Sequence, residues 1–107
     1  MVPLFHVEKR KPSFDLEAFK TVCGDPQRLK VTVTAALSAA SLGFDQDEIA
    51  TIIRSMKPAH FHKSMTSYGD HRKWQDVYHV RWDQMVLYVK FTDDVVSAFT
   101  VLSFKEL

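Results

Sequence analysis

Two adjoining segments of the second half of the chain alternate with period two, and this pattern strongly limits the possible folds. Alternation of this kind is typical of β-strands, because successive side chains of a strand point to opposite faces. The short link at Asp83-Gln84 between the segments predicts a hairpin. Its apolar face is predicted to comprise Tyr78, Val80, Trp82, Leu87 and Val89.

A further strand is predicted after the hairpin. The segment from Val95 to Phe104 is apolar on both faces, which predicts a central strand of the sheet. We expect it to pair with the preceding strand across Asp93-Asp94.

The first half of the chain has helical patterns. Ser13 or Asp15 can cap a first helix, which Gly24-Asp25-Pro26 ends. A second helix is predicted from about Thr32 to Leu42, with Gly43 as its left-handed cap. The apolar face of the first helix comprises Leu16, Phe19, Val22 and Cys23.

A third helix has the clearest signals. Asp45 and Glu48 form a cap pair, and Pro58 is expected to end the helix. The spacing i, i+3, i+4 and i+7 is met by Ile49, Ile52, Ile53 and Met56. The predicted fold class is therefore α+β, with N-terminal helices packed on a twisted antiparallel sheet.

Size and composition indicate one globular domain over residues 1–107. The chain is 46% hydrophobic, enough to bury a core, so disorder is not expected. Its one cysteine, Cys23, excludes an internal disulfide framework and suits a reducing compartment. No apolar run is long enough to span a membrane, and the start lacks the signal-peptide pattern. We therefore expect a soluble, cytoplasmic protein.

Positive charge is concentrated in one window, although the net charge is only +1. Between Arg54 and Arg81 lie six lysines or arginines but only two aspartates, together with four of the five histidines. Interleaved aromatic residues make this window suitable for an anionic, base-bearing ligand such as RNA. A solvated basic face is the simpler alternative.

Hairpin pairing gathers polar side chains on the second face. A turn at Asp83-Gln84 places His79 opposite Tyr88, whereas a turn at Gln84-Met85 places His79 opposite Lys90. Opposite partners lie about 4.5–5.5 Å apart at Cβ, close enough for one phosphate to contact several of them. Both registers leave the same four side chains on this face: His79, Arg81, Tyr88 and Lys90. A solvated outer face of a half-buried sheet is again the simpler interpretation.

The densest polar stretch, residues 61–78, and the two ends of the chain have a more specific pattern. The residues concerned are Lys63-Ser64-Met65-Thr66, Tyr68, Asp70-His71, Trp74-Gln75-Asp76-Val77-Tyr78, Ser103-Phe104-Lys105-Glu106, and Glu8-Lys9-Arg10 with Pro12. In these residues the chain resembles the MqsR toxin family. The resemblance is strong over 61–78 and at the C-terminus, and weaker through the helices.

This resemblance implies a bacterial type II toxin with a RelE-like fold. Such a toxin would cleave mRNA without the ribosome, with a preference for GCU, and would be neutralised by an MqsA-like antitoxin. The family's catalytic lysine, glutamine and tyrosine fall on Lys63, Gln75 and Tyr88, and its neighbouring methionine falls on Met65.

Three positions depart from a well-known member of that family. His62 replaces a tyrosine before the lysine, His79 replaces an arginine, and Ser13 replaces a histidine. The two histidines have an unperturbed pKa of about 6.5, which suits proton transfer near neutral pH. His62 and His79 are therefore candidate catalytic residues, although a structural role is equally open.

The candidate residues suit RNA cleavage without a metal or other cofactor. Such cleavage needs a base for the 2′-hydroxyl, a cation for the phosphorane and an acid for the 5′-oxygen. Lys63 can neutralise the phosphorane, or act as base if neighbouring cations lower its pKa. Tyr88 can donate a proton, and we expect cationic neighbours to lower its pKa; Gln75 can orient a phosphate oxygen. The expected products have 2′,3′-cyclic phosphate and 5′-hydroxyl ends.

The remaining candidates are residues predicted to bind RNA and histidines that resemble metal ligands. The predicted RNA contacts, besides the catalytic set, are Met65, Arg72, Lys73, Arg81 and Lys90. His60, His62 and His71 could suggest zinc, but no thiol and no ligand quartet accompanies them, so no metal is predicted.

Two functions from other classes stay open. One is a RelE-like or ParE-like protein that acts by protein contact, for which a proton-transfer set would be unnecessary. The other is a catalytically weakened RNA-binding module, which the exchanges at His62 and His79 would allow.

Overall fold

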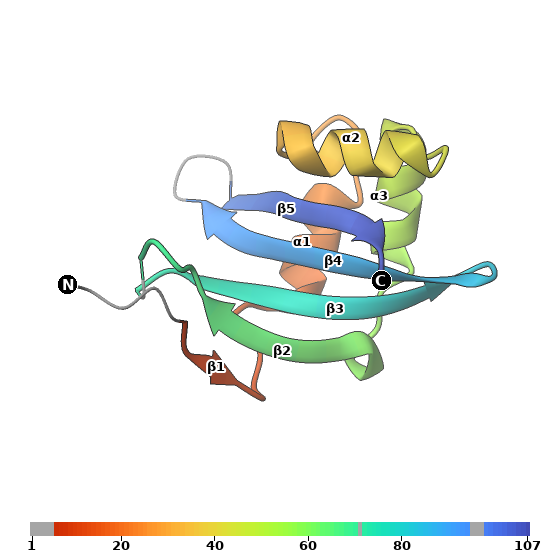
Figure 1. Cartoon of the computed structure of the whole chain (residues 1–107). Coiled ribbons are helices and arrows are strands. Elements are labelled where there is room, and N and C mark those ends of the chain that lie inside the picture. Colours follow the sequence, from red (N-terminus) through yellow and green to blue (C-terminus); the bar gives the residue numbers. More distant parts are fainter. Residues whose placement is uncertain (1–5, 71, 95–97) are drawn as a thin grey trace.

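The computed structural model describes residues 6–70, 72–94 and 98–107, and over these residues it confirms the predicted α+β class. Helices α1, α2 and α3 precede most of the sheet in sequence (Figure 1). The elements are β1 (Glu8–Lys9), α1 (Leu16–Cys23), α2 (Val33–Ser41), α3 (Gln46–Arg54), the 3-10 helix η1 (Pro58–His60), β2 (Phe61–Thr66), β3 (Trp74–Trp82), β4 (Met85–Asp94) and β5 (Ala98–Glu106).

The described strands form one antiparallel sheet in the order β1-β2-β3-β4-β5. The sequence patterns had not predicted β1 or β2 as strands. In Figure 1 α1 and α3 lie behind the sheet and α2 lies along its β5 side, so the near face of the sheet has no helix over it. We call this uncovered side the open face; it carries Lys63, Gln75, His79, Tyr88 and Lys90.

The predicted caps of the helices are largely confirmed. Asp15, not Ser13, caps α1, and its carboxylate accepts a hydrogen bond from the Ala18 N–H. Asp45 and Glu48 form the predicted capping box of α3. Gly43 follows α2 with φ 86°, the left-handed conformation expected of a helix-ending glycine.

The end of α3 differs from the prediction. The helix ends at Arg54, and the N–H groups of Ser55 and Met56 bond three residues back, to Ile52 and Ile53. The tightened last turn still buries Met56 in the core. Pro58, expected to end the helix, instead begins η1, where its missing N–H is tolerated.

Aromatic packing joins the helices to the sheet. The Phe19 ring of α1 stacks on the Phe91 ring of β4, with 3.6 Å between centroids. Phe99 of β5 contacts both rings edge-on. Cys23 lies within this core, and burial raises the pKa of its thiol, which agrees with a packing role.

The prediction that the last strand is central is wrong, because β5 lies at the edge of the sheet. Its outer backbone is nevertheless covered: the Val101 N–H donates to Lys30 O, and the Thr32 N–H donates to Val101 O. These bonds satisfy N–H and C=O groups that an open edge would leave unpaired. The predicted pairing with β4 is confirmed, while the expected start at Val95 lies outside the described residues.

The β3–β4 hairpin has the first of the two predicted registers. Its turn is at Asp83-Gln84, with Asp83 at φ 54°, and His79 pairs with Tyr88. Tyr78, Val80 and Leu87 of the predicted apolar face belong to the core.

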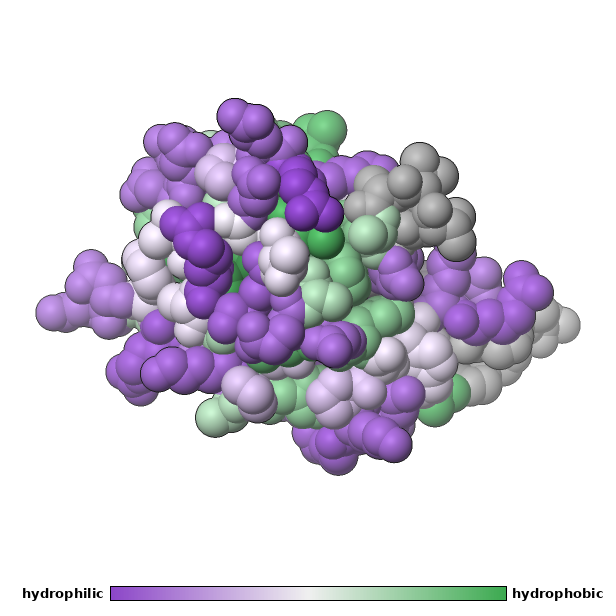
Figure 2. Space-filling view, turned by 180° about the vertical axis from the view of Figure 1, so that it is seen from behind, coloured by the Kyte–Doolittle hydropathy of each residue, from purple (hydrophilic) through white to green (hydrophobic). Residues whose placement is uncertain are grey.

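Many hydrophilic side chains cover the molecule on the side seen from behind in Figure 2. The charged residues of α1 and α3 include Glu17, Lys20, Asp47, Glu48 and Arg54. None of the helices described is both long and apolar enough to cross a membrane.

Candidate active site

A β-bulge in β2 shapes one side of the open face. Phe61 pairs with Tyr78 and Lys63 pairs with Val77, so His62 is the extra residue between two consecutive pairs. Phe61 packs on the core side against Tyr78, while Lys63 faces the open side. The bulge therefore brings His62 and Lys63, which are adjacent in sequence, to the same region of the open face.

Two lysines flank the centre of the open face. Val77 pairs with Lys63 on one side and with Lys90 on the other. Although no helix covers it, Val77 is fully buried, so the long side chains around it lie over it. The Lys63 side chain is only 21% exposed, and Lys90 is half-buried. Two ammonium groups are thus held close to one strip of the sheet.

A carboxylate on the edge strand holds Lys63. Its ammonium donates to Glu8 Oε2 at 2.6 Å, and His6 Nε2 lies 2.5 Å from the same oxygen. Hydrogen bonds from Lys63 and then from His6 lower the pKa of the Glu8 carboxyl to about 2. Lys63 is therefore paired as a cation, which favours electrostatic stabilisation over the role of base.

Gln75 lies beside this pair on the open face. It pairs with Met65 of β2, which in turn pairs with Glu8 of β1. Met65 is only 7% exposed, so most of its surface packs beneath its neighbours. The Gln75 amide is half-buried, two residues along β3 from Val77.

The two histidines that depart from the family pattern lie in contact. The His62 and His79 rings stack with 4.0 Å between centroids and 19° between planes. Partial burial, followed by the charges of His62 and Lys63, lowers the pKa of His79. At neutral pH His79 is thus a neutral imidazole able to accept a proton.

Tyr88 lies directly opposite His79, with 6.0 Å between ring centroids. The expectation that cationic neighbours lower the Tyr88 pKa is wrong. Burial raises this pKa more than the nearby Lys63 lowers it, and Glu8 adds to the rise. Tyr88 therefore keeps its proton at neutral pH and is a hydrogen-bond donor.

Lys90 and a second lysine border Tyr88. The Lys105 ammonium lies 5.2 Å from the centroid of the Tyr88 ring. Burial, then Lys105 and Lys63, lower the pKa of Lys90. Arg81, at the hairpin end of β3, is exposed on the same face.

Arg72 and Lys73 are not part of this cluster. They belong to the β2–β3 loop and line a separate pocket with Lys9, Phe14 and Trp74. Of the aromatic residues in the same basic window, Tyr78 is not available to RNA. It is buried in the core, where burial and Asp76 raise its pKa to about 12.

Two residues of the open face were not predicted as site residues, namely Glu8 and Lys105. Both belong to the family-like segments at the chain ends. Their partners could not be derived, because neither β1 nor the register of β5 was predicted. Across residues 6–70, 72–94 and 98–107, no three His, Cys, Asp or Glu side chains group as metal ligands; His71 lies outside these ranges.

Helices on one face of an antiparallel sheet and a cluster of cations, imidazoles and a phenol on the other define the class: a small α+β protein with an open, cation-rich sheet face. The chain belongs to the MqsR toxin family. It matches the family described as "Motility quorum-sensing regulator, toxin of MqsA" over residues 11–106. It is 38% identical over 100 residues to the mRNA interferase toxin MqsR of Escherichia coli (strain K12), covering 94% of this chain and 99% of that protein.

Proposed function

We propose that this chain is an mRNA interferase, an endoribonuclease that cuts mRNA by attack of the 2′-hydroxyl on the neighbouring phosphate. Family membership and the name of the Escherichia coli relative support the activity. The observation that carries the proposal is the gathering of Lys63, Gln75 and Tyr88, from three strands, on one face with His79.

The two pKa shifts support the assignment of the proton transfers. His79, neutral because its pKa is lowered, accepts the proton of the 2′-hydroxyl as the 2′-oxygen attacks phosphorus. The bond from phosphorus to the 5′-oxygen breaks, and Tyr88, protonated because its pKa is raised, donates a proton to that oxygen. The products have 2′,3′-cyclic phosphate and 5′-hydroxyl ends. Transfer of the proton from His79 back to Tyr88 through water restores the site.

The remaining residues bind the RNA and stabilise the transition state. Lys63, oriented by Glu8, and Lys90 neutralise the charge that develops on the phosphorane. The Gln75 amide orients a phosphate oxygen or a base edge. His62 supports the His79 ring by stacking and contributes to lowering its pKa. Since these side chains supply both charge stabilisation and proton transfer, the mechanism requires no metal.

Family membership supports the finer features of the proposal. We infer cleavage without the ribosome, a GCU-like preference, an MqsA-like antitoxin as partner, and action in the bacterial cytoplasm, where mRNA is found. Covering the open face, or distorting it, would be sufficient for the antitoxin to silence the enzyme.

Substitution of Tyr88 by phenylalanine tests the proposal directly. Tyr88→Phe removes one hydroxyl, and loss of a general acid typically costs about 10²–10⁴-fold in rate. We expect a folded protein that binds RNA normally and cleaves it at least roughly a hundredfold more slowly. Lys63→Ala should weaken both binding and rate.

Tyr68→Phe is the matched control, because Tyr68 is an exposed tyrosine whose loss of a hydroxyl should leave cleavage near normal. Single-turnover cleavage and RNA binding are measured for all three variants. Near-normal cleavage by both Tyr88→Phe and Lys63→Ala would exclude this active site and favour a protein that acts by contact.

A further inference from the structure

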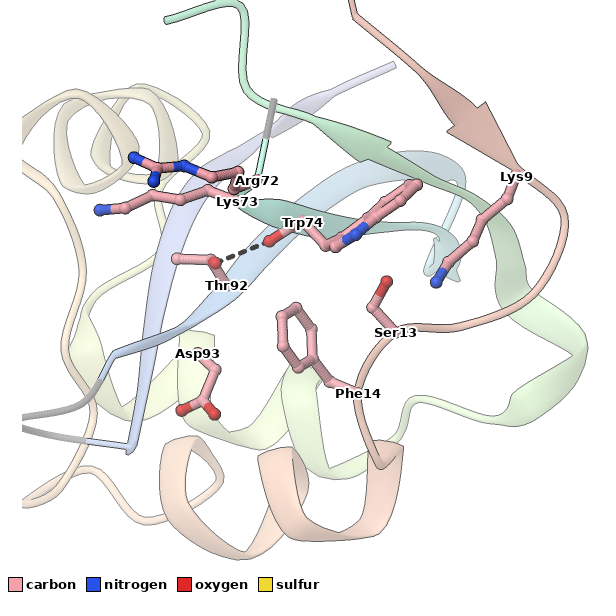
Figure 3. Close-up of a pocket in the computed structure, with 8 residues that line it drawn as sticks. All are labelled: Lys9, Ser13, Phe14, Arg72, Lys73, Trp74, Thr92 and Asp93. Carbon is pink, nitrogen blue, oxygen red and sulfur yellow. Dashed lines mark hydrogen bonds between the residues drawn. The ribbon is translucent and has the colours of Figure 1, made fainter. Parts of the chain in front are cut away.

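A pocket lies across the sheet from the active site, at the end where β3 begins. It has a volume of about 550 Å³. Its lining includes the aromatic Phe14 and Trp74, the cations Lys9, Arg72 and Lys73, and the carboxylate Asp93. Figure 3 shows the two rings on different sides of the pocket, with Lys9 toward one end and Arg72 and Lys73 toward the other.

From this lining we infer a second RNA subsite, which holds one nucleotide beyond the scissile phosphate. The base lies against Trp74 and Phe14, and its phosphate contacts Arg72 and Lys73. This inference rests on the proposed function, because it extends the path of the same RNA strand.

The aromatic walls are suitable for a base. Phe14 is fixed by ring contacts to Phe91 and Phe99, with centroids 6.1 and 6.4 Å away. Trp74 is half-buried, and its backbone oxygen accepts a hydrogen bond from Thr92. Every base has a flat π-face, so stacking on such rings binds single-stranded RNA.

The charged side chains of the pocket favour a nucleotide over a simple anion. The Lys9 ammonium lies 4.1 Å from the centroid of the Trp74 ring, and it can exchange this contact for a phosphate when a base stacks there. Arg72 and Lys73 are exposed, and Arg72 Nε donates to Asp70 Oδ1 at 3.1 Å, which leaves its other guanidinium nitrogens for a phosphate. Asp93 would repel a bare anion, whereas its carboxylate can accept hydrogen bonds from the amino group of a base.

Residues of the pocket are neighbours of active-site residues. Trp74 and Gln75 are neighbours in β3, with one side chain toward each face of the sheet. Ser13, which also lines the pocket, bonds through Oγ to Ser64 Oγ at 2.6 Å, and Ser64 is the neighbour of Lys63. An RNA strand that leaves Gln75 and passes over the end of the sheet therefore reaches the pocket.

The first experiment measures how cleavage depends on RNA length. The shortest RNA that the wild-type protein cleaves is compared with the same RNA extended by single nucleotides at either end. We expect kcat/KM to rise about tenfold on extension at one end, the factor that one stacked base would give. In Arg72→Ala/Lys73→Ala this gain should be lost, so that the shortest and the extended RNAs are cleaved with similar kcat/KM.

The double variant Arg28→Ala/Lys57→Ala is the control, because it removes the same two charges at exposed positions that do not line the pocket. It should keep the length dependence. A gain that survives in Arg72→Ala/Lys73→Ala would overturn the subsite while leaving the active site intact. Failure of the wild type to cleave any RNA would instead contradict the proposed function.

A second measurement reports the stacking itself without altering Trp74. Trp74 is the only tryptophan left in the Trp82→Phe/Tyr88→Phe variant, which should bind RNA and cleave it at least roughly a hundredfold more slowly, so that binding is read before cleavage. We expect extended RNA to quench its fluorescence and the shortest RNA to leave it nearly unchanged. Quenching by the antitoxin but by neither RNA would overturn the proposal and identify the pocket as a protein-docking surface.

Discussion

Burial changes the pKa of His79 and that of Tyr88 in opposite directions, and so separates a base from an acid within one cross-strand pair. The sequence placed both residues on one face through hairpin parity alone. It predicted the wrong direction for the Tyr88 pKa, because neighbouring charges could be inferred from pairing but burial could not. The stacking of His62 on His79 was equally hidden, since it depends on a bulge.

His62→Ala tests the environment of His79. In the intact protein the His79 pKa is lowered by burial and by the charges of His62 and Lys63. Removing the His62 ring exposes His79 and relieves the repulsion, so its pKa should rise toward about 6.5. Because the base must be neutral, the acid limb of the kcat/KM profile should move to higher pH.

NMR titration of the His79 imidazole gives the same pKa independently of cleavage. His60→Ala is the matched control, because His60 lies outside the stacked pair and should leave the profile in place. An acid limb that does not move, while the NMR pKa of His79 does, would show that another group is the base.

At the scale of elements, a buried carboxylate joins the N-terminal segment to the sheet. Asp76 of β3 is fully buried and accepts hydrogen bonds from the N–H groups of Ser13 and Phe14 at 3.0–3.1 Å. These residues precede α1 and line the pocket that holds Trp74. The family-like run over 74–78 thus includes an anchor for the helical layer, a role that sequence alone could not assign.

Asp76→Ala should destabilise the protein. The substitution leaves two backbone N–H groups without their acceptor, and we expect the free energy of unfolding to fall by about 2–4 kcal/mol. Asp47→Ala, an exposed aspartate of α3, is the control and should change it by less than about 0.5 kcal/mol. Urea denaturation measures both, and equal effects of the two substitutions would contradict the anchoring role.

For the whole molecule, local patterns predicted the fold class, three helices and the central hairpin, with two registers left open for its pairing. Their caps, periods and turn residues are all local in sequence. The patterns failed where pairing is distant: β1 has only two residues, β2 is interrupted by a bulge, and the segment 30–32 covers the outer edge of β5. Glu8 and Lys105 reach the open face only through these distant pairings.

The most direct test of the central claim is to map the RNA ends that the purified protein produces in the presence of EDTA. Attack by the 2′-hydroxyl, with His79 and Tyr88 transferring protons, predicts cleavage that EDTA leaves unchanged. Every cut should leave a 2′,3′-cyclic phosphate and a 5′-hydroxyl, and Tyr88→Phe should produce the same ends more slowly. Loss of cleavage in EDTA, or products with 5′-phosphates, would contradict the mechanism.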